Sequence, residues 1–380
     1  MFFQRTKLVK RIDNTTHNRD KKIIICIENT TLAKKHYLCD MVIHKTDCQM
    51  STNAALVSVV LCTYNGGRYL KDQIDSLIAQ YYPLHEILIQ DDGSTDDTVQ
   101  IAAQYAAKYD NIHLSTNTHE HGINSNFFSA LRQASGEFIA ICDQDDIWEP
   151  DKISCQVQAI GDRLMCFCHS KPFSEDGSFA HYDKRMPNYS LYRLLFNNEI
   201  PGHTILMHRS LLNLLPEEGC EAMYQKRMYD IILALTAAAY DSIVFVDKPL
   251  VHHRRYEEAA TYSSYSGSLP SAGNATHILK WSICHYHKMK KLTHERYTTQ
   301  MTFLSQLRQP APPCEESIRF MNLLISNRFI DFVRLIRMCV KHRFEIFHTR
   351  GKDPVNILRA MLFPFTSLYY CRFLLNLSDK

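Results

Sequence analysis

Short apolar runs alternate with segments of helical spacing along residues 56–142 of the chain. The runs at 56–61, 87–89, 112–115 and 137–142 predict strands. Most of these runs are aliphatic and β-branched without polar alternation, which is typical of strands covered on both faces. Between the first two runs, the segment 69–79 carries its apolar residues on one helical face. The succession of strand, polar turn and helix predicts an α/β fold, with a mostly parallel sheet flanked by helices.

Polar and acidic residues follow three of these runs, at 63–65, 91–92 and 143–146. Ligands of parallel sheets bind at the carboxyl ends of the strands, so these residues are expected to share one edge. The three carboxylates within 143–146 offer the hard oxygen ligands that suit Mg²⁺ or Mn²⁺, and these ions suit a diphosphate. Asp-rich turns also cap helices, and the residues alone leave that alternative open. Residues 62–67 lack the glycine spacing of a dinucleotide site, which disfavours a plain NAD site.

Three blocks of the sequence resemble the family 2 glycosyltransferases of the GT-A (Rossmann-like) fold. The blocks are 57–70, 90–98 and 136–146, and their order and spacing match that family. The form Cys-Asp-Gln-Asp-Asp-Ile-Trp-Glu-Pro at 142–150 resembles the rhamnosyltransferase-like branch that builds bacterial surface polysaccharides. The resemblance covers roughly 56–261 and implies a glycosyltransferase that uses a nucleotide-sugar donor.

The resemblance also implies which residues bind the nucleotide. Thr63, Tyr64 and Asn65 would line the pocket for the base and the ribose. Asp92 would accept a hydrogen bond from the N3–H group of uracil or thymine, because a buried carboxylate selects such a donor.

The acidic residues at 143–146 form the D-x-D element that the resemblance implies. Asp145 is the expected direct ligand of Mg²⁺ or Mn²⁺, with Asp143 nearer the ribose or a metal-bound water. The cation would neutralise charge that develops on the leaving nucleoside diphosphate. Asp146 is expected to cap the turn into the helix near Pro150 and Lys152.

An inverting transfer needs a carboxylate that takes the proton from the acceptor hydroxyl. Asp230, at the start of an apolar helical segment, matches the position of this base in the family. The alternative is a helix N-cap, and one residue could do both. Tyr229 departs from the Glu or His that the family more often shows there. Gly202 and His203 either shape the acceptor or phosphate pocket or are structural.

The segment 252–256 follows the last expected strand, where family members often carry an Arg and a His near the diphosphate or the metal. Arg254 is the expected cation at the diphosphate, with Arg255 beside it. Tyr256 stands where a His is frequent. A metal-ligand role for His252 or His253 and a structural role are both open.

The composition is that of a globular protein, with 380 residues of which 45% are hydrophobic and 22% charged. Thirteen cysteines without a framework spacing indicate reduced thiols and a cytoplasmic location. No signal peptide or spanning helix is evident. A net charge of only +3, with acids clustered at the expected site, disfavours nucleic acid as a partner.

Three regions are expected along the chain. Residues 1–49 would be a poorly ordered or non-native extension, 50–262 the GT-A domain, and 263–380 a helical region after a linker at 263–271. The stretch 357–377 is apolar and aromatic, and residues 319–380 hold 11 Lys and Arg against 4 Asp and Glu. This region either lies on an anionic membrane surface or packs as a helical subdomain on the catalytic domain or on a dimer partner.

The leading hypothesis is an inverting hexosyltransferase with a metal and an Asp base. It would move a sugar from a nucleotide-diphosphate donor, with dTDP-rhamnose as the first choice, to a lipid-linked surface glycan. Its location would be cytoplasmic, at the inner face of the cell membrane. One alternative is the same fold with a UDP-hexose or UDP-N-acetylhexosamine donor. Another is a nucleotide-sugar-binding scaffold without turnover.

Overall fold

The computed structural model describes residues 9–12, 23–26, 54–175, 177, 182, 184–256, 272–347, 353–372 and 374. The chain divides into two compact units, Met1–Ala54 and Ala55–Lys380. In the first unit the described strands β1 (Val9–Ile12) and β2 (Ile23–Cys26) pair in antiparallel fashion. The rest of the extension expected at 1–49 and the linker expected at 263–271 lie outside the described residues.

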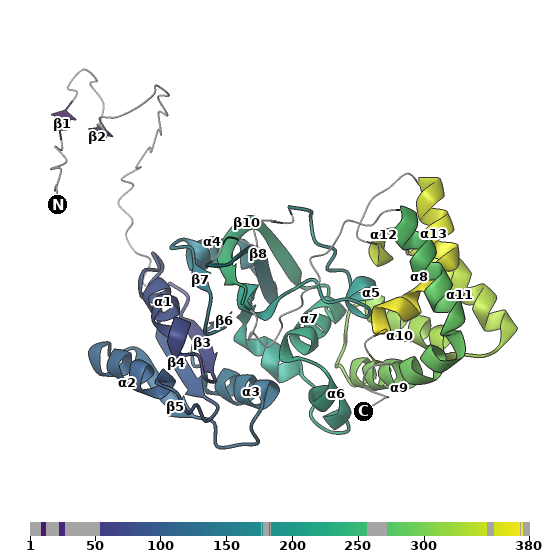
Figure 1. The fold of residues 1–380 in the computed structure, drawn as a ribbon, viewed down its shortest axis with the longest axis horizontal. Helices are drawn as coiled ribbons and strands as arrows, with labels where there is room; N and C mark the ends of the chain where they lie inside the picture. Colours follow the sequence, from purple (N-terminus) through teal and green to yellow (C-terminus); the bar gives the residue numbers. More distant parts are fainter. Residues whose placement is uncertain are drawn as a thin grey trace. The chain divides into compact units, whose positions relative to one another are not determined.

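The second unit is built on an eight-stranded sheet with the order β5-β4-β3-β6-β9-β8-β10-β7 (Figure 1). The four strands of its parallel half are β3 (Val57–Thr63), β4 (Glu86–Asp91), β5 (Ile112–Thr116) and β6 (Phe138–Cys142). These are the strands that the apolar runs predict.

The other half of the sheet is mixed. Its strands are β7 (Ile147–Trp148), β8 (Met165–Phe173), β9 (Leu206–His208) and β10 (Ile243–Arg254). β10 runs parallel to β8, but β9 is antiparallel to both β6 and β8, and β7 is antiparallel to β10. Parallel pairs still predominate, in agreement with the expected fold class.

Both faces of the parallel half are buried. Val57, Val59 and Leu61 of β3 belong to one hydrophobic cluster, whereas Val60 and Cys62 belong to another. Successive side chains of a strand point to opposite faces, so a strand with helices on both sides must be apolar at every position. The nearly continuous apolar run at 56–61, in which only Ser58 is polar, is the consequence.

Helices from different parts of the chain cover the two faces. The helices whose residues join the first cluster are α1 (Gly67–Ile78), α2 (Thr98–Lys108) and α4 (Lys152–Ile160). Those that join the second cluster include α3 (Ile123–Gln133), α5 (Leu191–Leu194), α6 (Glu221–Lys226) and α7 (Tyr229–Ala239). The short helices η1 (Gly202–Thr204) and η2 (Arg209–Leu214) flank β9.

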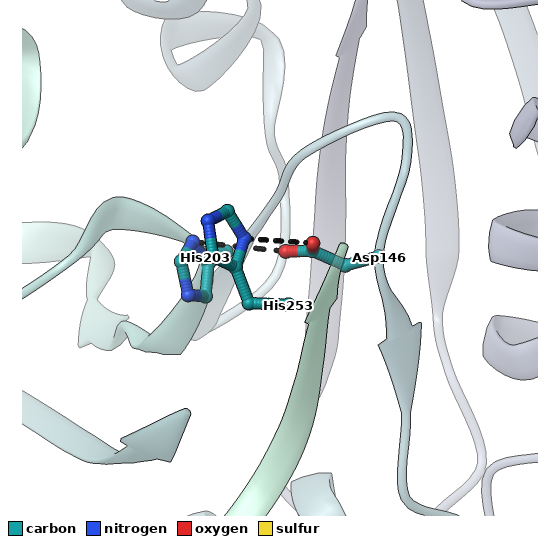
Figure 2. A group of neighbouring side chains, drawn as sticks. All are labelled: Asp146, His203 and His253. Carbon is teal, nitrogen blue, oxygen red and sulfur yellow. Dashed lines mark hydrogen bonds and ion pairs between the residues drawn. The ribbon is translucent and has the colours of Figure 1, made fainter. Parts of the chain in front are cut away.

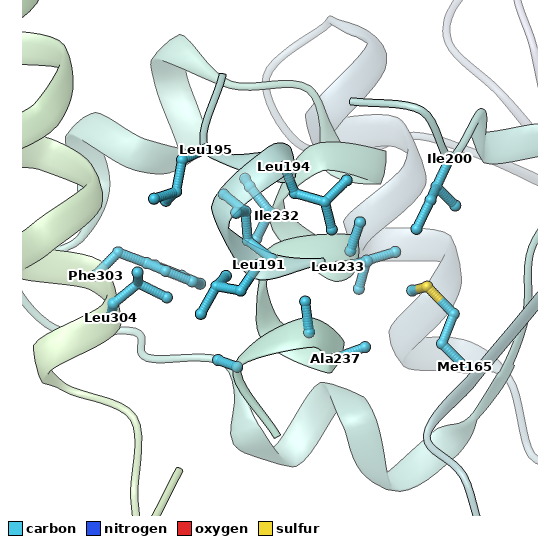
Figure 3. Close-up of a cluster of buried hydrophobic side chains, with 14 of the residues drawn as sticks. Met165, Leu191, Leu194, Leu195, Ile200, Ile232, Leu233, Ala237, Phe303 and Leu304 are labelled. Atoms are coloured by element: carbon cyan, nitrogen blue, oxygen red, sulfur yellow. The ribbon is translucent and has the colours of Figure 1, made fainter. Parts of the chain in front are cut away.

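The C-terminal part of the chain is helical and extends the second cluster. Its elements are α8 (Ala272–Cys284), α9 (Tyr286–Ser305), α10 (Pro312–Ile325), α11 (Phe329–Lys341), α12 (Arg343–Ile346), α13 (Asp353–Thr366) and η3 (Ser367–Cys371). Figure 3 shows Phe303 and Leu304 of α9 among side chains of α5 and α7. The amide of Asn188 also donates to the carbonyl oxygen of Phe347 at 2.9 Å. The structure therefore favours the alternative of a helical subdomain packed on the catalytic domain.

Part of the apolar stretch expected at 357–377 is buried. Among its described residues, Ala360 and Phe363 belong to this core, whereas Ile357, Leu358 and Met361 are exposed. Phe363 is 1% exposed and its ring lies 4.9 Å from that of Phe196, while Leu368 and Cys371 are also buried. None of the helices in the described ranges is both long enough and apolar enough to cross a membrane.

Phe363 provides a test of how far the C-terminal helices belong to one cooperative core. Phe363→Ala removes a buried aromatic side chain, so the free energy of unfolding should fall by about 3–5 kcal/mol. Met361→Ala is a matched control on the same helix, because Met361 is 47% exposed, and its effect should stay within about 0.5 kcal/mol. Urea denaturation followed by circular dichroism measures both. If Phe363→Ala shifts only a separate transition and leaves the main one unchanged, the C-terminal helices unfold independently of the catalytic domain.

Candidate active site

Three polar segments follow β3, β4 and β6, which are neighbours in the sheet and run in the same direction. Their side chains therefore meet at one edge, as the sequence predicts. Asp91 organises the first two segments. Its Oδ1 accepts a hydrogen bond from the Thr63 hydroxyl at 2.9 Å, and its Oδ2 accepts from the backbone N–H groups of Gly93 and Ser94 at 2.9 and 2.7 Å. Thr63 is 2% exposed, so its hydroxyl holds the turn together.

Asp92 lies at the centre of this edge and is 8% exposed. Its carboxylate accepts hydrogen bonds from the Asn117 amide and the Gly122 N–H, both at 2.7 Å, and His121 Nδ1 lies 3.3 Å away. A carboxylate has about four acceptor sites, so these three contacts leave about one for a ligand. The expected role of Asp92 at a base N–H group stays a prediction that this geometry accommodates.

Tyr64 and Asn65 form the turn between β3 and α1. Tyr64 is 57% exposed, and its backbone makes two hydrogen bonds with the side chain of Gln144, N to Oε1 at 2.8 Å and O to Nε2 at 3.1 Å. Asn65 has a positive φ of 47°, and its Oδ1 accepts from the Thr95 N–H at 2.8 Å. A Cβ atom on Gly66 would lie 2.2 Å from Gln144 Oε1. The turn thus lies directly against Gln144, a residue for which the sequence predicts no role.

Residues 143–146, which follow β6 and are called the acidic turn here, hold three carboxylates close enough to repel one another. Burial, followed by the charges of Asp146 and Asp143, raises the pKa of Asp145 to about 6, although a hydrogen bond from the Tyr256 hydroxyl opposes the shift. That hydrogen bond reaches Asp145 Oδ2 at 2.6 Å. The side chain of Asp143 is 34% exposed. A bound divalent cation would relieve this repulsion, so the oxygen-rich turn fits Mg²⁺ or Mn²⁺.

Asp146 does not cap the following helix, and that expectation is wrong. Its Oδ1 instead accepts from His253 Nδ1 and from the Arg254 N–H, both at 3.0 Å. The cap residue of α4 is Asp151. The physical reason is the strand β7, which lies between the acidic turn and α4 in the sequence. Because β7 pairs with β10, Asp146 is directed toward the end of β10 and not toward α4.

Arg254 is 5% exposed and is surrounded by protein acceptors. Its guanidinium donates to the Asp145 carbonyl at 2.9 Å, to Asp72 at 3.1 Å and to Glu175 at 3.3 Å. It also lies 4.3 Å from the centroid of the Tyr69 ring. Arg254 thus holds the acidic turn against α1, and its expected contact with a diphosphate stays a prediction.

Asp230 is the second residue of α7, and the N-cap position belongs to Met228, so Asp230 is not the N-cap. Its Oδ1 accepts from the Ile231 N–H at 2.7 Å and its Oδ2 from the Asn198 amide at 3.0 Å. Burial raises the pKa of Asp230 to about 6, with a further contribution from the charge of Asp143. A carboxylate with such a pKa is ionised near neutrality and basic enough to take a proton. The contribution of Asp143 also shows that the acidic turn and α7 lie within electrostatic range.

Asn124 of α3 connects the two halves of the site. Its Oδ1 accepts from the Tyr229 N–H at 2.8 Å, and its amide donates to the Arg227 carbonyl at 2.5 Å. The Tyr229 ring stacks on Phe127 with 3.9 Å between centroids, and a Cβ on Gly202 would lie 2.2 Å from the Tyr229 hydroxyl oxygen. Because Gly202 has no side chain, there is room for Tyr229 at the position where the family more often has Glu or His.

The two histidines of β10 have different partners. His252 Nε2 lies 2.6 Å from Glu149 Oε1, whereas His253 joins Asp146 and His203. The sequence points to His203 and His253 separately but not to their pairing, because they are fifty residues apart and meet only through β8 and η1. Apart from their residue type, nothing in the sequence indicates that Asn124 and Asn198 belong to the site.

Residues 58–232 match the family model described as "Glycosyl transferase family 2". TuaG of Bacillus subtilis, whose name provisionally assigns it to teichuronic acid biosynthesis as a glycosyltransferase, is 35% identical over 154 residues, 40% of this chain and 61% of that protein. WfgD of Escherichia coli, a UDP-Glc:alpha-D-GlcNAc-diphosphoundecaprenol beta-1,3-glucosyltransferase, is 30% identical over 159 residues, 42% of this chain and 62% of that protein. The matches thus span about three fifths of these relatives. A solved structure of S. aureus TarS has a TM-score of 0.47 and 16% identity, and the alignment covers 83% of this chain and 91% of that one.

Residues 58–232, a little less than half of the chain, are thus similar to glycosyl transferase family 2. The resemblance drawn from the sequence blocks is confirmed at the level of the family. The rhamnosyltransferase-like branch stays a prediction.

Proposed function

We propose that this chain is an inverting glycosyltransferase that moves a sugar from a nucleoside-diphosphate donor to a hydroxyl group of a glycan acceptor. The observation that carries the proposal is Asp230, a half-buried carboxylate with a pKa raised to about 6, within electrostatic range of Asp143 in the acidic turn. A single base facing the donor site is what direct displacement with inversion requires. Similarity to the family over 58–232 supports the same reaction class.

The residues on the donor side and on the acceptor side of the site have different roles in the proposed reaction. Asp92 has about one acceptor site left for the N3–H of a uracil or thymine base. Asp145 and Asp143 would hold a Mg²⁺ or Mn²⁺ ion, which neutralises charge on the leaving diphosphate when it is bound. Asp230 takes the proton of the attacking hydroxyl, and the hydrogen bond from Asn198 orients its carboxylate.

The donor and the acceptor follow from chemistry and from the names of relatives. Uracil and thymine present the same N3–H group, so Asp92 accommodates dTDP-rhamnose as well as a UDP-hexose or UDP-N-acetylhexosamine. The name of WfgD includes a UDP-glucose donor and a diphosphoundecaprenol acceptor. This supports a UDP-sugar as the second candidate donor and a lipid-linked glycan as the acceptor class.

A thermal-shift panel tests donor binding. UDP-, dTDP- and GDP-sugars are compared with and without Mn²⁺ or Mg²⁺, and one donor at about 100 times its Kd should stabilise the fold by about 2.7 kcal/mol. Asp145→Ala should abolish the part of the shift that depends on metal. Asp162→Ala is the control, because Asp162 is an exposed aspartate away from the acidic turn. The absence of any shift with every donor would contradict the nucleotide-sugar site.

Asp230→Asn separates an enzyme from a binding scaffold. The substitution removes the base but keeps the shape, so transfer should fall by about 10²–10⁴-fold while the donor-induced thermal shift is retained. The wild type should lose kcat/KM about tenfold per pH unit below a pKa of about 6, because only the ionised Asp230 accepts the proton. At saturating metal, which keeps Asp145 ionised, the residual activity of the variant should lack this acidic limb. If donor binding occurs but wild-type and variant rates are equally at background with lipid-linked acceptors, the scaffold alternative replaces the enzyme.

The C-terminal helices supply a candidate membrane contact for a lipid-linked acceptor. Phe329 at the start of α11 is 81% exposed, and Ile330 beside it is 47% exposed. A groove of about 820 Å³ adjoins this turn and is lined by basic residues, among them Lys290, Lys291 and Arg328. Exposed apolar side chains next to cations suit an anionic lipid surface, and we propose peripheral binding there.

Vesicle co-sedimentation tests this contact. The wild type should bind vesicles rich in phosphatidylglycerol more than vesicles of phosphatidylcholine, and the Phe329→Ser/Ile330→Ser double variant should lose most of that binding. Tyr81→Ser is the control, because Tyr81 is 77% exposed but lies in the catalytic domain. Equal binding by the wild type and the double variant would place the membrane contact elsewhere.

A further inference from the structure

Asp146, His203 and His253 form a compact group from three separate segments (Figure 2). Asp146 comes from the acidic turn, His203 from η1 and His253 from the end of β10. One ligand atom from each lies within 4.8 Å of the others. The group is enclosed, since the side chains of Asp146, His203 and His253 are 0%, 7% and 19% exposed. Of the three segments, only the acidic turn has a role in the proposed transfer.

The carboxylate of Asp146 is incompletely satisfied. Oδ1 accepts two hydrogen bonds, but the wholly buried Oδ2 has no hydrogen-bond partner. A buried oxygen in that state destabilises the fold, because it has lost its water without gaining a partner, so native structures rarely leave one. His203 Nδ1 is 3.6 Å from Oδ2, which is within ion-pair distance when the ring is protonated but too long for a hydrogen bond.

The ligand atoms lie close to the spacing of a coordination shell, with different oxygens of Asp146 facing the two histidines and all the atoms within 4.8 Å of one another. His253 Nδ1 lies 3.0 Å from Asp146 Oδ1, and His203 Nδ1 lies 3.6 Å from Asp146 Oδ2. Bonds of about 2.0–2.1 Å in a tetrahedron place neighbouring ligand atoms about 3.3 Å apart, between these two values. Asp143 Oδ2 is 3.4 Å from the same His203 nitrogen, on the more exposed side of the group.

His203 is oriented as a metal-binding histidine usually is. His203 Nε2 is 2.9 Å from the Ser170 hydroxyl, a partner on the far ring nitrogen that sets the orientation of the ring. The rings of His203 and His253 stack at 4.6 Å with an interplanar angle of 11°.

We propose that Asp146, His203 and His253 bind a transition-metal ion, Zn²⁺ in the first place, behind the oxygen ligands of the acidic turn. Two imidazole nitrogens and one carboxylate suit Zn²⁺, Co²⁺ or Mn²⁺ and disfavour Mg²⁺ and Ca²⁺. The ion would tie the acidic turn to η1 and to the end of β10 without a nucleotide, so it is separate from the cation expected at Asp145.

Metal binding by the complete chain, without nucleotide, tests the proposal. Protein stripped with a chelator is titrated with Co²⁺, and the visible d–d bands of a tetrahedral site are recorded; Zn²⁺ retained after dialysis is measured by mass spectrometry. The wild type should hold about one equivalent of metal and show the bands. Ser170→Ala should weaken binding by about 10–100-fold, because the partner of His203 is lost.

Variants at neighbouring positions distinguish this site from the cation site expected at Asp145. His253→Ala and Asp146→Asn should abolish the bands, whereas His252→Ala should keep them, because His252 is next in the strand but pairs with Glu149. Asp145→Ala should also keep the bands while losing the metal-dependent thermal shift with donor. Circular dichroism and urea denaturation show that each variant is folded, and His203→Gln replaces any variant that is not.

Two results would overturn the proposal. If the folded wild type neither retains Zn²⁺ nor shows Co²⁺ bands, the group is a hydrogen-bonded charge network with His203 protonated. If Asp145→Ala abolishes the bands and Asp146→Asn keeps them, the metal belongs to the diphosphate site alone. Because no nucleotide is present, either failure leaves the proposed transfer reaction to be judged by its own tests.

Discussion

The constraint on which the site depends is the repulsion among three carboxylates held within four residues at the edge of a buried sheet. In water these side chains would separate, but a turn between β6 and β7 keeps them together. His203 of η1 and the end of β10 supply the compensation at Asp146. The end of β10 directs His253 and the Arg254 N–H to Asp146, while Tyr256 beyond it donates to Asp145. The register of β10 against β8 is irregular a few residues earlier in the strand, with shifts around Pro249.

A second requirement is that the base on α7 keeps its position relative to the acidic turn. Asn124 ties the start of α7 to α3, and Gly202 leaves room for Tyr229. Behind α7 lies the hydrophobic cluster that it shares with α9. The C-terminal helices are therefore part of what supports Asp230, even though the family model ends at 232. Weaker packing in that cluster would therefore displace Asp230, on the acceptor side of the site, before it displaced the residues of the donor side.

The sequence predicts well the parts of the structure that depend on local order. The four parallel strands and the acidic turn follow from runs of apolar residues and the polar residues after them, because both faces of β3, β4 and β6 are covered. Pairings between distant segments could not be derived in this way. The antiparallel insertion of β9 and the return of β7 to β10 are set by tertiary packing, and they account for the error at Asp146. Arg254 shows the same limit: its residue type suggested a ligand contact, but Asp72 and Glu175, far away in the sequence, occupy its donors.

Asp145 and Asp230 have pKa values raised to the same level, but the physical causes differ in how they would respond to a cation. Burial contributes to both, yet the next causes at Asp145 are its neighbours Asp146 and Asp143, whereas Asp230 is partly balanced by hydrogen bonds from Ile231 and Asn198. A divalent cation at the acidic turn would cancel the repulsion at Asp145 and ionise it fully. It would leave the burial of Asp230 unchanged and remove only the smaller contribution of Asp143. Loading the donor side would thus complete the ionisation of the ligands while the acceptor side keeps a base matched to neutral pH.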